Sequence, residues 1–156
     1  MSLFTFGYEG LSVDQFVRRL REAGVQLVFD VRQHPLSRKP GFSKTALAMA
    51  LEHGEIGYEH IAALGCPRDI RDRYKSDGDW PAYARAFRSY LATQRDAVAR
   101  VAEIAADNSI CLVCFEADHT RCHRSLVALA AMRLGVPATT HLSITKERPG
   151  RVRQAA

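Results

Sequence analysis

The sequence predicts an α/β fold, a three-layer α/β/α sandwich around a largely parallel sheet of about five strands. Two observations lead to this prediction. Short apolar segments of strand length alternate with segments whose apolar residues recur at helical spacing. In addition, residues 25–31 ("VQLVFDV") and 110–115 ("ICLVCF") are almost wholly apolar, which is typical of parallel strands covered on both sides. The 156 residues suffice for one domain, which we place at 1–145.

The first half of the chain contains three predicted strands and two predicted helices. A strand at 3–6 is followed by a turn and by Ser12, which with Gln15 forms a capping box for a helix that ends before Gly24. The strand at 25–31 leads into residues 32–43 ("RQHPLSRKPGFS"), an irregular loop with basic but no acidic residues. A second helix follows Ser43 and ends at about residue 53, and a short strand is expected near 58–61.

The second half begins with a polar stretch that has no clear periodicity. Residues 66–80 mix both charge signs, and we expect a surface segment or a lid there. Asp79 and Pro81 then indicate the start of one long helix that continues to about residue 106. A buried strand at 110–115, a helix from about residue 122 to residue 134 and a last short strand at 138–142 complete the pattern.

Composition narrows the class of protein. Four cysteines in a chain of this length do not indicate a disulfide-rich secreted scaffold, so reduced thiols are expected. No apolar stretch approaches the roughly 20 residues of a membrane helix, and the first residues lack the pattern of a signal peptide. We therefore predict a cytoplasmic protein with no membrane contact. The net charge of +5 suits an anionic partner, although residues 146–156, a basic tail that we expect to be frayed, contribute part of it.

Polar residues follow several predicted strands at the point where each strand ends. Because the carboxyl ends of parallel strands meet at one edge of a sheet, we expect these residues to line a common crevice. The predicted ligand-binding residues are Gly7, Tyr8, Arg32, Arg38, Lys39, Cys114 and Arg124. The predicted catalytic residues are Asp30, Glu116, Cys122 and His123. A structural ion pair of Asp30 with Arg32 or Arg124, beside a solvated basic loop, is the alternative explanation for the charged members.

The segment "CFEADHTRCHRS" (114–125) contains the most chemistry in the sequence. Cys111 and Cys114 form a C-x-x-C pair, but residues three apart on a strand point to opposite faces, so we expect Cys111 to be a buried core thiol. Zinc bound by Cys114, His119, Cys122 and His123 is an alternative. Closed zinc sites normally combine two short ligand pairs, however, and only one is present, so we predict no cofactor.

Cys122 opens a predicted helix, where the helix dipole and nearby cationic residues lower a thiol pKa, so it is the candidate for a reactive sulfur. The alternative is that Cys122 is a small residue packed under the start of the helix, while Arg124 pairs with Glu116 or Asp118. The spacing Cys114-x6-Arg121 is similar to the anion loop of cysteine phosphatases and rhodaneses. It is one residue longer, and Glu116 and Asp118 would repel a phosphate there.

The motifs together resemble one family. "FTFGYEG", "FDVRQHPLSRKPGFSK", "IGYEHIAALG" and "CLVCFEADHTRCHRS" look like the bacterial family catalogued as domain of unknown function 488, over the chain from Phe4 to about Leu142. The resemblance implies that the strand-end residues form a shared functional set, but it names no reaction. Members of the family often have a histidine where this sequence has Tyr8.

The leading hypothesis is a protein that binds a phosphate-bearing ligand, such as a nucleotide or a nucleic-acid end, in the crevice. Arg32, Arg38 and Arg124 would bind the anion, while Asp30 and Glu116 orient these arginines or act as acid and base. Hydrolysis or transfer at a phosphoester or glycosidic centre is the reaction class to test if the protein is an enzyme. The alternatives are a non-catalytic nucleic-acid-binding module using loop 32–44 and the basic tail, and a metal-binding protein using the 114–123 segment.

Overall fold

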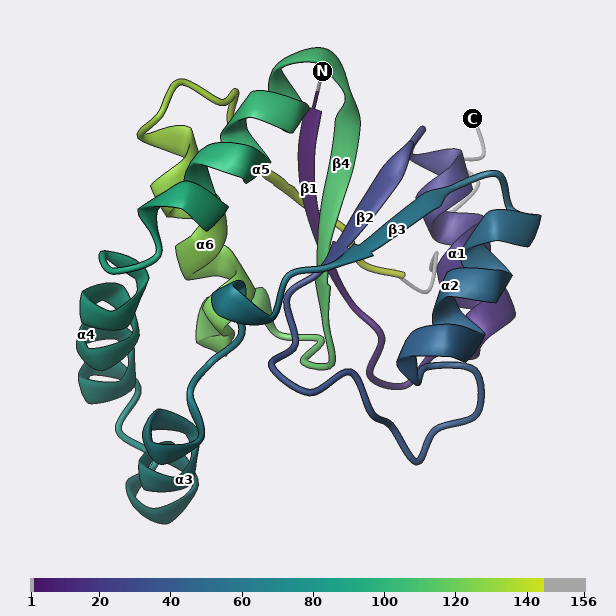
Figure 1. Cartoon of the computed structure of the whole chain (residues 1–156). Helices are drawn as coiled ribbons and strands as arrows, with labels where there is room; N and C mark the ends of the chain where they lie inside the picture. The colour runs from purple at the N-terminus through teal and green to yellow at the C-terminus, as the bar shows by residue number, and fades with distance from the viewer. Residues whose placement is uncertain (1, 145–156) are drawn as a thin grey trace, which may run out of the picture.

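The computed structural model describes residues 2–144, and Figure 1 shows the chain. The strands are β1 (Ser2–Gly7), β2 (Leu27–Asp30), β3 (Gly57–His60), β4 (Ser109–Cys114) and β5 (Thr140–His141). The helices are α1 (Val13–Glu22), α2 (Lys44–His53), α3 (Arg68–Asp77), α4 (Trp80–Leu91), α5 (Arg95–Asp107) and α6 (His123–Met132), with 3₁₀ turns η1 (Ala62–Leu64) and η2 (His119–Arg121). The predicted basic tail at 146–156 lies outside the described residues.

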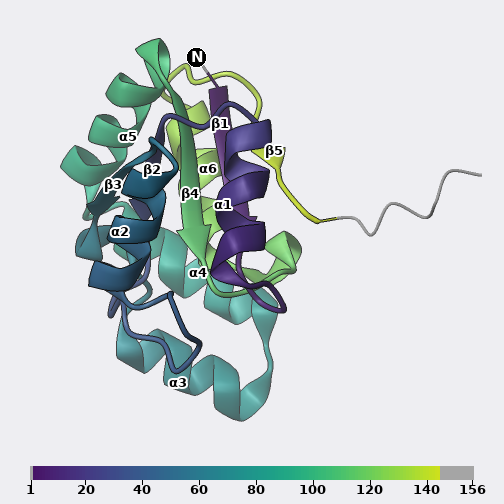
Figure 2. The ribbon, with the colours of Figure 1, turned by 90° about the vertical axis from the view of Figure 1, so that its right-hand side faces the viewer.

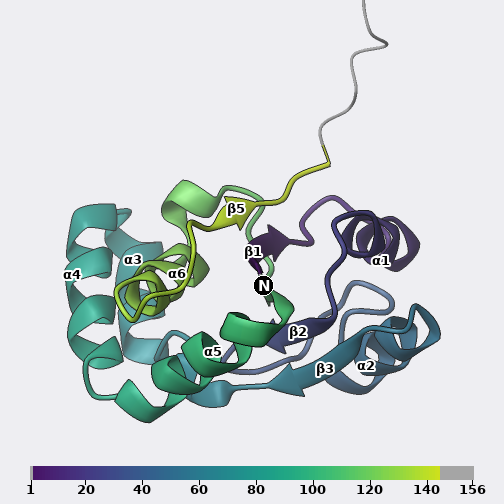
Figure 3. The same ribbon diagram turned by 90° about the horizontal axis from the view of Figure 1, so that it is seen from above.

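The five strands form one sheet in the order β3-β2-β4-β1-β5, and every pairing is parallel. The α/β fold class predicted from the alternation of segments is therefore confirmed. Helices α1 and α2 cover one face of the sheet, and α5 and α6 cover the other (Figure 3). Each face has its own apolar core, and side chains that alternate along the strands enter the two cores in turn.

Strand β4 lies at the centre of the sheet and shows this alternation directly. Cys111 packs with the core under α1 and α2, whereas Cys114 packs with the core under α4, α5 and α6. Both thiols are buried, and Cys111 is a core residue as predicted. The strand geometry that separates the two C-x-x-C sulfurs is thus confirmed.

The order of the strands creates a switch point in the sheet, where the connections after two neighbouring strands lie on opposite faces. The connection from β1 leads through α1 to β2 on one face, and the connection from β4 leads through α6 to β5 on the other. Because β1 and β4 are neighbours, the loops that follow them leave toward opposite faces. In a parallel sheet a crevice opens at such a point, beyond the carboxyl ends of the strands.

Two features of the second half differ from what the sequence indicated. The segment at 66–80, expected to be a surface segment or a lid, does lie at the surface, but it contains the helix α3, which was not predicted. This helix has no fully buried residue, and two exposed i,i+4 ion pairs, Arg68–Asp72 and Arg73–Asp77, run along it. With so few apolar positions the helix leaves almost no periodic signal in the sequence. Figures 1 and 2 show it beyond the carboxyl ends of the strands.

The single long helix predicted up to residue 106 is two helices, α4 and α5. They are separated by a short break at which the Thr93 hydroxyl donates a hydrogen bond to the Tyr90 carbonyl, at 2.6 Å. A threonine hydroxyl that donates to a backbone carbonyl three residues earlier competes with the hydrogen bonds of the helix. The apolar residues keep a helical spacing on both sides of the break, so the sequence pattern did not reveal it.

No helix within residues 2–144 has the length and apolar character required to cross a lipid bilayer.

Candidate functional site

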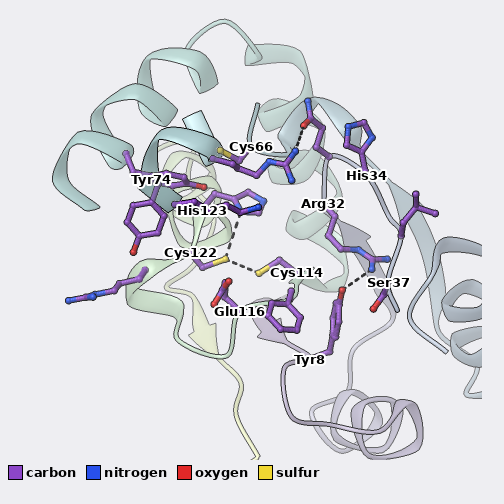
Figure 4. A pocket seen from close by; sticks show the side chains of 17 residues that line it. Tyr8, Arg32, His34, Ser37, Cys66, Tyr74, Cys114, Glu116, Cys122 and His123 are labelled. Carbon is purple, nitrogen blue, oxygen red and sulfur yellow. Dashed lines mark hydrogen bonds between the residues drawn. The ribbon is translucent and has the colours of Figure 1, made fainter. Parts of the chain in front are cut away.

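A crevice of about 500 Å³ lies beyond the carboxyl ends of β1, β2 and β4 (Figure 4). Its floor and walls come from the loops after these strands, from the start of α6 and from one side of α3. The main lining residues are Tyr8, Arg32, Cys66, Arg71, Tyr74, Lys75, Phe115, Glu116, Arg121, Cys122 and His123. The crevice therefore lies at the switch point between β1 and β4, and several of the predicted site residues line it.

Cys114 and Cys122 form a pair of buried thiols at one side of the crevice. Their Sγ atoms are 2.8 Å apart, and both residues also line the crevice. Strand β4 ends at Cys114, and Cys122 is the N-cap of α6, so the strand end and the helix start bring the two sulfurs together. The sequence predicted both residues for the site, and the structure places them in contact.

His123 lies beside this pair and has a defined orientation. Its Nε2 atom is 2.7 Å from the carbonyl oxygen of Val31, and a carbonyl can only accept, so Nε2 carries a proton. In the neutral imidazole, Nδ1 is then an acceptor, and it lies 3.8 Å from Cys122 Sγ. The geometry therefore lets His123 receive a proton from the Cys122 thiol.

Arg124 lies underneath the two sulfurs and is completely buried. Its Nη1 atom donates to Cys114 Sγ at 3.0 Å and to the carbonyl of Glu116, and Nη2 donates to the carbonyl of Ala117 at 3.4 Å. No carboxylate within residues 2–144 forms an ion pair with it. A buried charge with hydrogen-bond partners but no opposite charge beside it is unfavourable, so the neighbouring sulfurs are the natural place for a balancing negative charge.

The arrangement determines which sulfur loses its proton first. Cys114 Sγ already accepts from Arg124, so its own S–H is free to point at Cys122 Sγ. Burial alone would raise the pKa of the Cys122 thiol, but the hydrogen bond from Cys114 and the charge of Arg124 outweigh burial and lower that pKa. Burial and the same hydrogen bond raise the pKa of the Cys114 thiol well above its usual value. Cys122 is therefore the first thiol of the pair to lose its proton.

Asp30 and Arg32 form a separate cluster on the other side of the crevice. Arg32 Nε and Nη2 donate to the two carboxylate oxygens of Asp30 at 2.9 and 2.7 Å, and the Asp30 carboxylate also accepts from Tyr58. Arg32 Nη1 donates to the Tyr8 hydroxyl and the Phe42 carbonyl. This bidentate ion pair is buried and nearly saturated with internal partners. It fixes the position of Tyr8 at the edge of the crevice.

Gly7 allows the loops after β1 and β4 to pack against each other. A Cβ atom at this position would lie 1.7 Å from the carbonyl oxygen of Glu116, the same oxygen that accepts from Arg124. The predicted role of Gly7 as a ligand-binding residue stays a prediction. What the structure shows is that a side chain here would displace the backbone that holds Arg124.

The crevice is mainly cationic and aromatic. Among the described residues, its charged side chains are Glu116 and four cations, Arg32, Arg71, Lys75 and Arg121. Arg71 Nη2 donates a hydrogen bond to Gln33 Oε1 at 3.0 Å, which orients the Arg71 side chain. Glu116 has a raised pKa, first because of partial burial and then because of the nearby carboxylate of Glu9. The site therefore offers positive charge together with one carboxyl group that holds its proton more tightly than usual.

Several predicted site residues are not brought to this crevice. Arg38 is exposed and Lys39 is half-buried over the ring of Phe42, and neither lines the crevice. His119 stacks on His141 with 3.8 Å between ring centroids, in a different cavity. Over residues 2–144, no group of three or more His, Cys, Asp or Glu side chains is arranged to hold a metal ion.

The sequence prediction missed the wall contributed by α3 and α4. Arg71, Tyr74 and Lys75 come from α3, and Tyr83 comes from α4. Helix α4 follows α3 and not a strand, so Tyr83 was not associated with the strand ends. The spacing of Arg71, Tyr74 and Lys75 places them on one face of a helix. This spacing was the signal in the sequence that could have indicated the wall, but it has meaning only if residues 68–77 are first recognised as a helix.

Comparison with known proteins gives one family match. The family model described as "Domain of unknown function DUF488" matches residues 12–131. The chain belongs to DUF488. The match covers β2, β4 and the start of α6, and so includes Asp30, Arg32, Cys114 and Cys122. Searches of curated proteins and of solved structures gave no match. The DUF488 assignment confirms the resemblance seen in the sequence, and it specifies no ligand or reaction.

Proposed function

We propose that this DUF488 protein binds a phosphate-bearing ligand, a nucleotide or a nucleic-acid end, in the crevice and acts on it with Cys122 as nucleophile. The observation that carries the proposal is the position of the Cys122 sulfur. It lies at the start of a helix, with a proton acceptor on His123 beside it, and it contacts the Cys114 sulfur, to which the buried Arg124 guanidinium donates. It also borders a crevice of cationic side chains. Such surroundings are typical of activated thiols.

The cationic wall supports an anionic ligand. Arg71 and Lys75 from α3 and Arg121 from η2 border the space in front of Cys122. Arg71 is oriented by Gln33, and its Nε atom is buried without a hydrogen-bond partner among the described residues. Arginine can bind phosphate through two parallel hydrogen bonds, and lysine adds a point charge. In this proposal these residues take the anion-binding role that the sequence had suggested for Arg32, Arg38 and Arg124.

The aromatic residues of the crevice suit the base of a nucleotide. Phe115 is 44% exposed, and its ring packs edge-on against Tyr8, with 5.5 Å between centroids. Tyr74 and Tyr83 provide a second aromatic pair on the wall formed by α3 and α4. Bases stack on such rings without sequence preference. A ligand that combines an aromatic ring with a phosphate would use both kinds of wall.

The proposed chemistry is substitution at a phosphoester or glycosidic centre. The Cys122 thiolate attacks the electrophilic atom, the bond to the leaving group breaks, and the leaving group takes a proton. His123 Nδ1 accepts the proton of Cys122 when the thiol form enters the reaction. Glu116, with its raised pKa, is the acid that protonates the leaving group. Asp30 orients Arg32 and, through it, Tyr8.

Nucleotide binding tests the proposal directly. Isothermal titration with a panel of nucleoside monophosphates should show binding. Arg71→Ala should weaken binding by at least about tenfold, because it removes a charge-assisted hydrogen bond. Arg38→Ala is the matched control, since Arg38 is exposed and does not line the crevice. Binding should also slow the alkylation of Cys122 by iodoacetamide. Equal affinities of the two variants, or no binding by any nucleotide of the panel, would contradict the proposal.

A further inference from the structure

The pair formed by Cys114 and Cys122 has a property that nucleotide binding does not require. Three thiols border the crevice, those of Cys66, Cys114 and Cys122, but within residues 2–144 the sulfur contact shown is between Cys114 and Cys122. Nucleophilic catalysis needs one sulfur. A second thiol held against the first is the arrangement of cysteines that form a disulfide in the course of their chemistry.

The backbone allows a bond between these two sulfurs. A disulfide has an S–S distance of about 2.03–2.05 Å, so the two Sγ atoms, at 2.8 Å, need to approach by less than about 1 Å. Cys114 is the last residue of β4, and Cys122 precedes α6. The residues between them form a largely exposed loop with the short turn η2.

We propose that Cys114 and Cys122 form a redox-active dithiol that reduces a hydroperoxide, with Cys122 as the attacking sulfur and Cys114 as the resolving sulfur. The inference goes beyond the proposed nucleotide chemistry and does not depend on it. Its basis is the contact between the two sulfurs, the proton acceptor on His123 and the buried charge of Arg124. The crevice gives a small peroxide access to the pair.

The chemistry balances in two steps. The Cys122 thiolate attacks one peroxide oxygen, so an S–O bond forms, the O–O bond breaks, and the departing alkoxide or hydroxide leaves as an alcohol or water after gaining a proton. Cys122 is then a sulfenic acid, oxidised by two electrons. The Cys114 sulfur attacks it, an S–S bond forms, the S–O bond breaks, and the hydroxide leaves as water with the proton of Cys114. Two thiols and one hydroperoxide thus give one disulfide, one alcohol or water, and one further water.

The surroundings of each cysteine explain this division of roles. Arg124 Nη1 donates to Cys114 Sγ, so negative charge that develops on Cys114 during the second step is stabilised. Cys66 has a different neighbourhood, because its Sγ contacts the carbonyl of Pro67 and burial raises its pKa to about 11. Cys111 lies on the opposite face of the sheet. Neither is placed to resolve a sulfenic acid on Cys122.

Titration of the reduced protein with hydrogen peroxide, followed by mass spectrometry, tests the inference. One equivalent should remove two hydrogen atoms from the protein, and digestion without reductant should give a peptide pair joined through Cys114 and Cys122. In Cys114→Ala the reaction should stop at the sulfenic acid, which dimedone labels on Cys122. Cys122→Ala should lose the fast reaction with peroxide. Cys111→Ala is the matched control, because Cys111 lies on the opposite face of the sheet, and it should form the disulfide as the wild type does.

The outcomes separate this inference from the nucleotide proposal, because no nucleotide is present in the titration. A disulfide that joins Cys66 or Cys111 to Cys122 would overturn it, as would stable sulfenic acid in the wild type or an unchanged product in Cys114→Ala. The disulfide mapping uses the wild type alone and therefore stays informative if a variant fails to fold. Nucleotide binding by reduced protein with no Cys114–Cys122 disulfide would leave the proposed function standing and refute the dithiol.

Discussion

Arg32 and Arg124 are both buried and lie on different sides of the crevice, Arg32 in its wall and Arg124 beneath the Cys114 sulfur. Their positive charges are balanced in different ways. Arg32 forms a bidentate ion pair with Asp30. Arg124 has backbone carbonyls and a sulfur as partners, and within residues 2–144 no carboxylate pairs with it. A carboxylate with an ordinary pKa is already charged at neutral pH, whereas most of a thiol with an ordinary pKa is still protonated there and ionises only where its surroundings favour it.

The difference assigns the two sides of the crevice different roles. The Asp30–Arg32 pair is a fixed structural unit that positions Tyr8. The positive charge of Arg124 instead favours ionisation of the neighbouring thiol pair, and it thereby prepares Cys122 to react. A buried arginine without a carboxylate partner therefore points to a reactive group nearby. The free-energy cost of burying its charge is offset when another group in contact with it becomes negative.

Breaking the Asp30–Arg32 pair should have the largest effect on stability. Arg32→Met leaves the Asp30 carboxylate fully buried without a cation, so we expect a loss of about 3–5 kcal/mol in the free energy of unfolding. Urea unfolding at neutral pH measures it. Arg124→Met is the matched comparison. Its loss should be smaller, about 1–2 kcal/mol, because the thiols can stay protonated and the Glu116 and Ala117 carbonyls lie in an exposed loop. Equal losses in the two variants would refute the difference in charge balance.

Gly7→Ala should have the next largest effect, and it acts on the Arg124 side alone. The new Cβ would lie 1.7 Å from the Glu116 carbonyl oxygen, so the loop must move and Arg124 must lose this partner. We expect a loss of roughly 2–3 kcal/mol, measured by urea unfolding. Gly10→Ala is the control, because a Cβ there meets nothing within 4 Å and only the positive φ of 79° opposes it. It should cost about 1 kcal/mol. A Gly7→Ala variant as stable as Gly10→Ala would contradict the close packing.

The sequence predicted the parts of the site that depend on strand order. Alternation along β4 separated Cys111 from Cys114, and the rule for parallel sheets placed Asp30, Arg32 and Cys122 near one edge. These predictions succeeded because the period of a strand and the direction of a parallel sheet follow from local patterns. The fold class and most element boundaries could be predicted for the same reason, whereas the family was recognised from its motifs.

The sequence did not reveal which charged side chains turn inward. Arg32, Arg38 and Lys39 lie in one basic segment, yet Arg32 is buried and Arg38 is exposed. Likewise, Arg121 lines the crevice while Arg124, three residues later, lies beneath the sulfurs. These positions depend on long-range partners such as Asp30 and the Glu116 carbonyl. The wall formed by α3 was missed because ion pairs, rather than an apolar stripe, mark that helix.

The dependence of stability on pH should show the smallest effect and the sharpest distinction between the two arginines. Cys122 has a pKa below the ordinary 9.0 in the folded protein, so between that pKa and about 9 the unfolded chain binds more protons. Stability should therefore rise with pH in this window, by at most about 1.4 kcal/mol per pH unit. Above about 9 the buried thiols with raised pKa oppose the rise. Urea unfolding across the window measures the slope, which should vanish in Cys122→Ala and in Arg124→Met. A slope that survives in Arg124→Met would mean that Arg124 does not set the charge of the thiol pair.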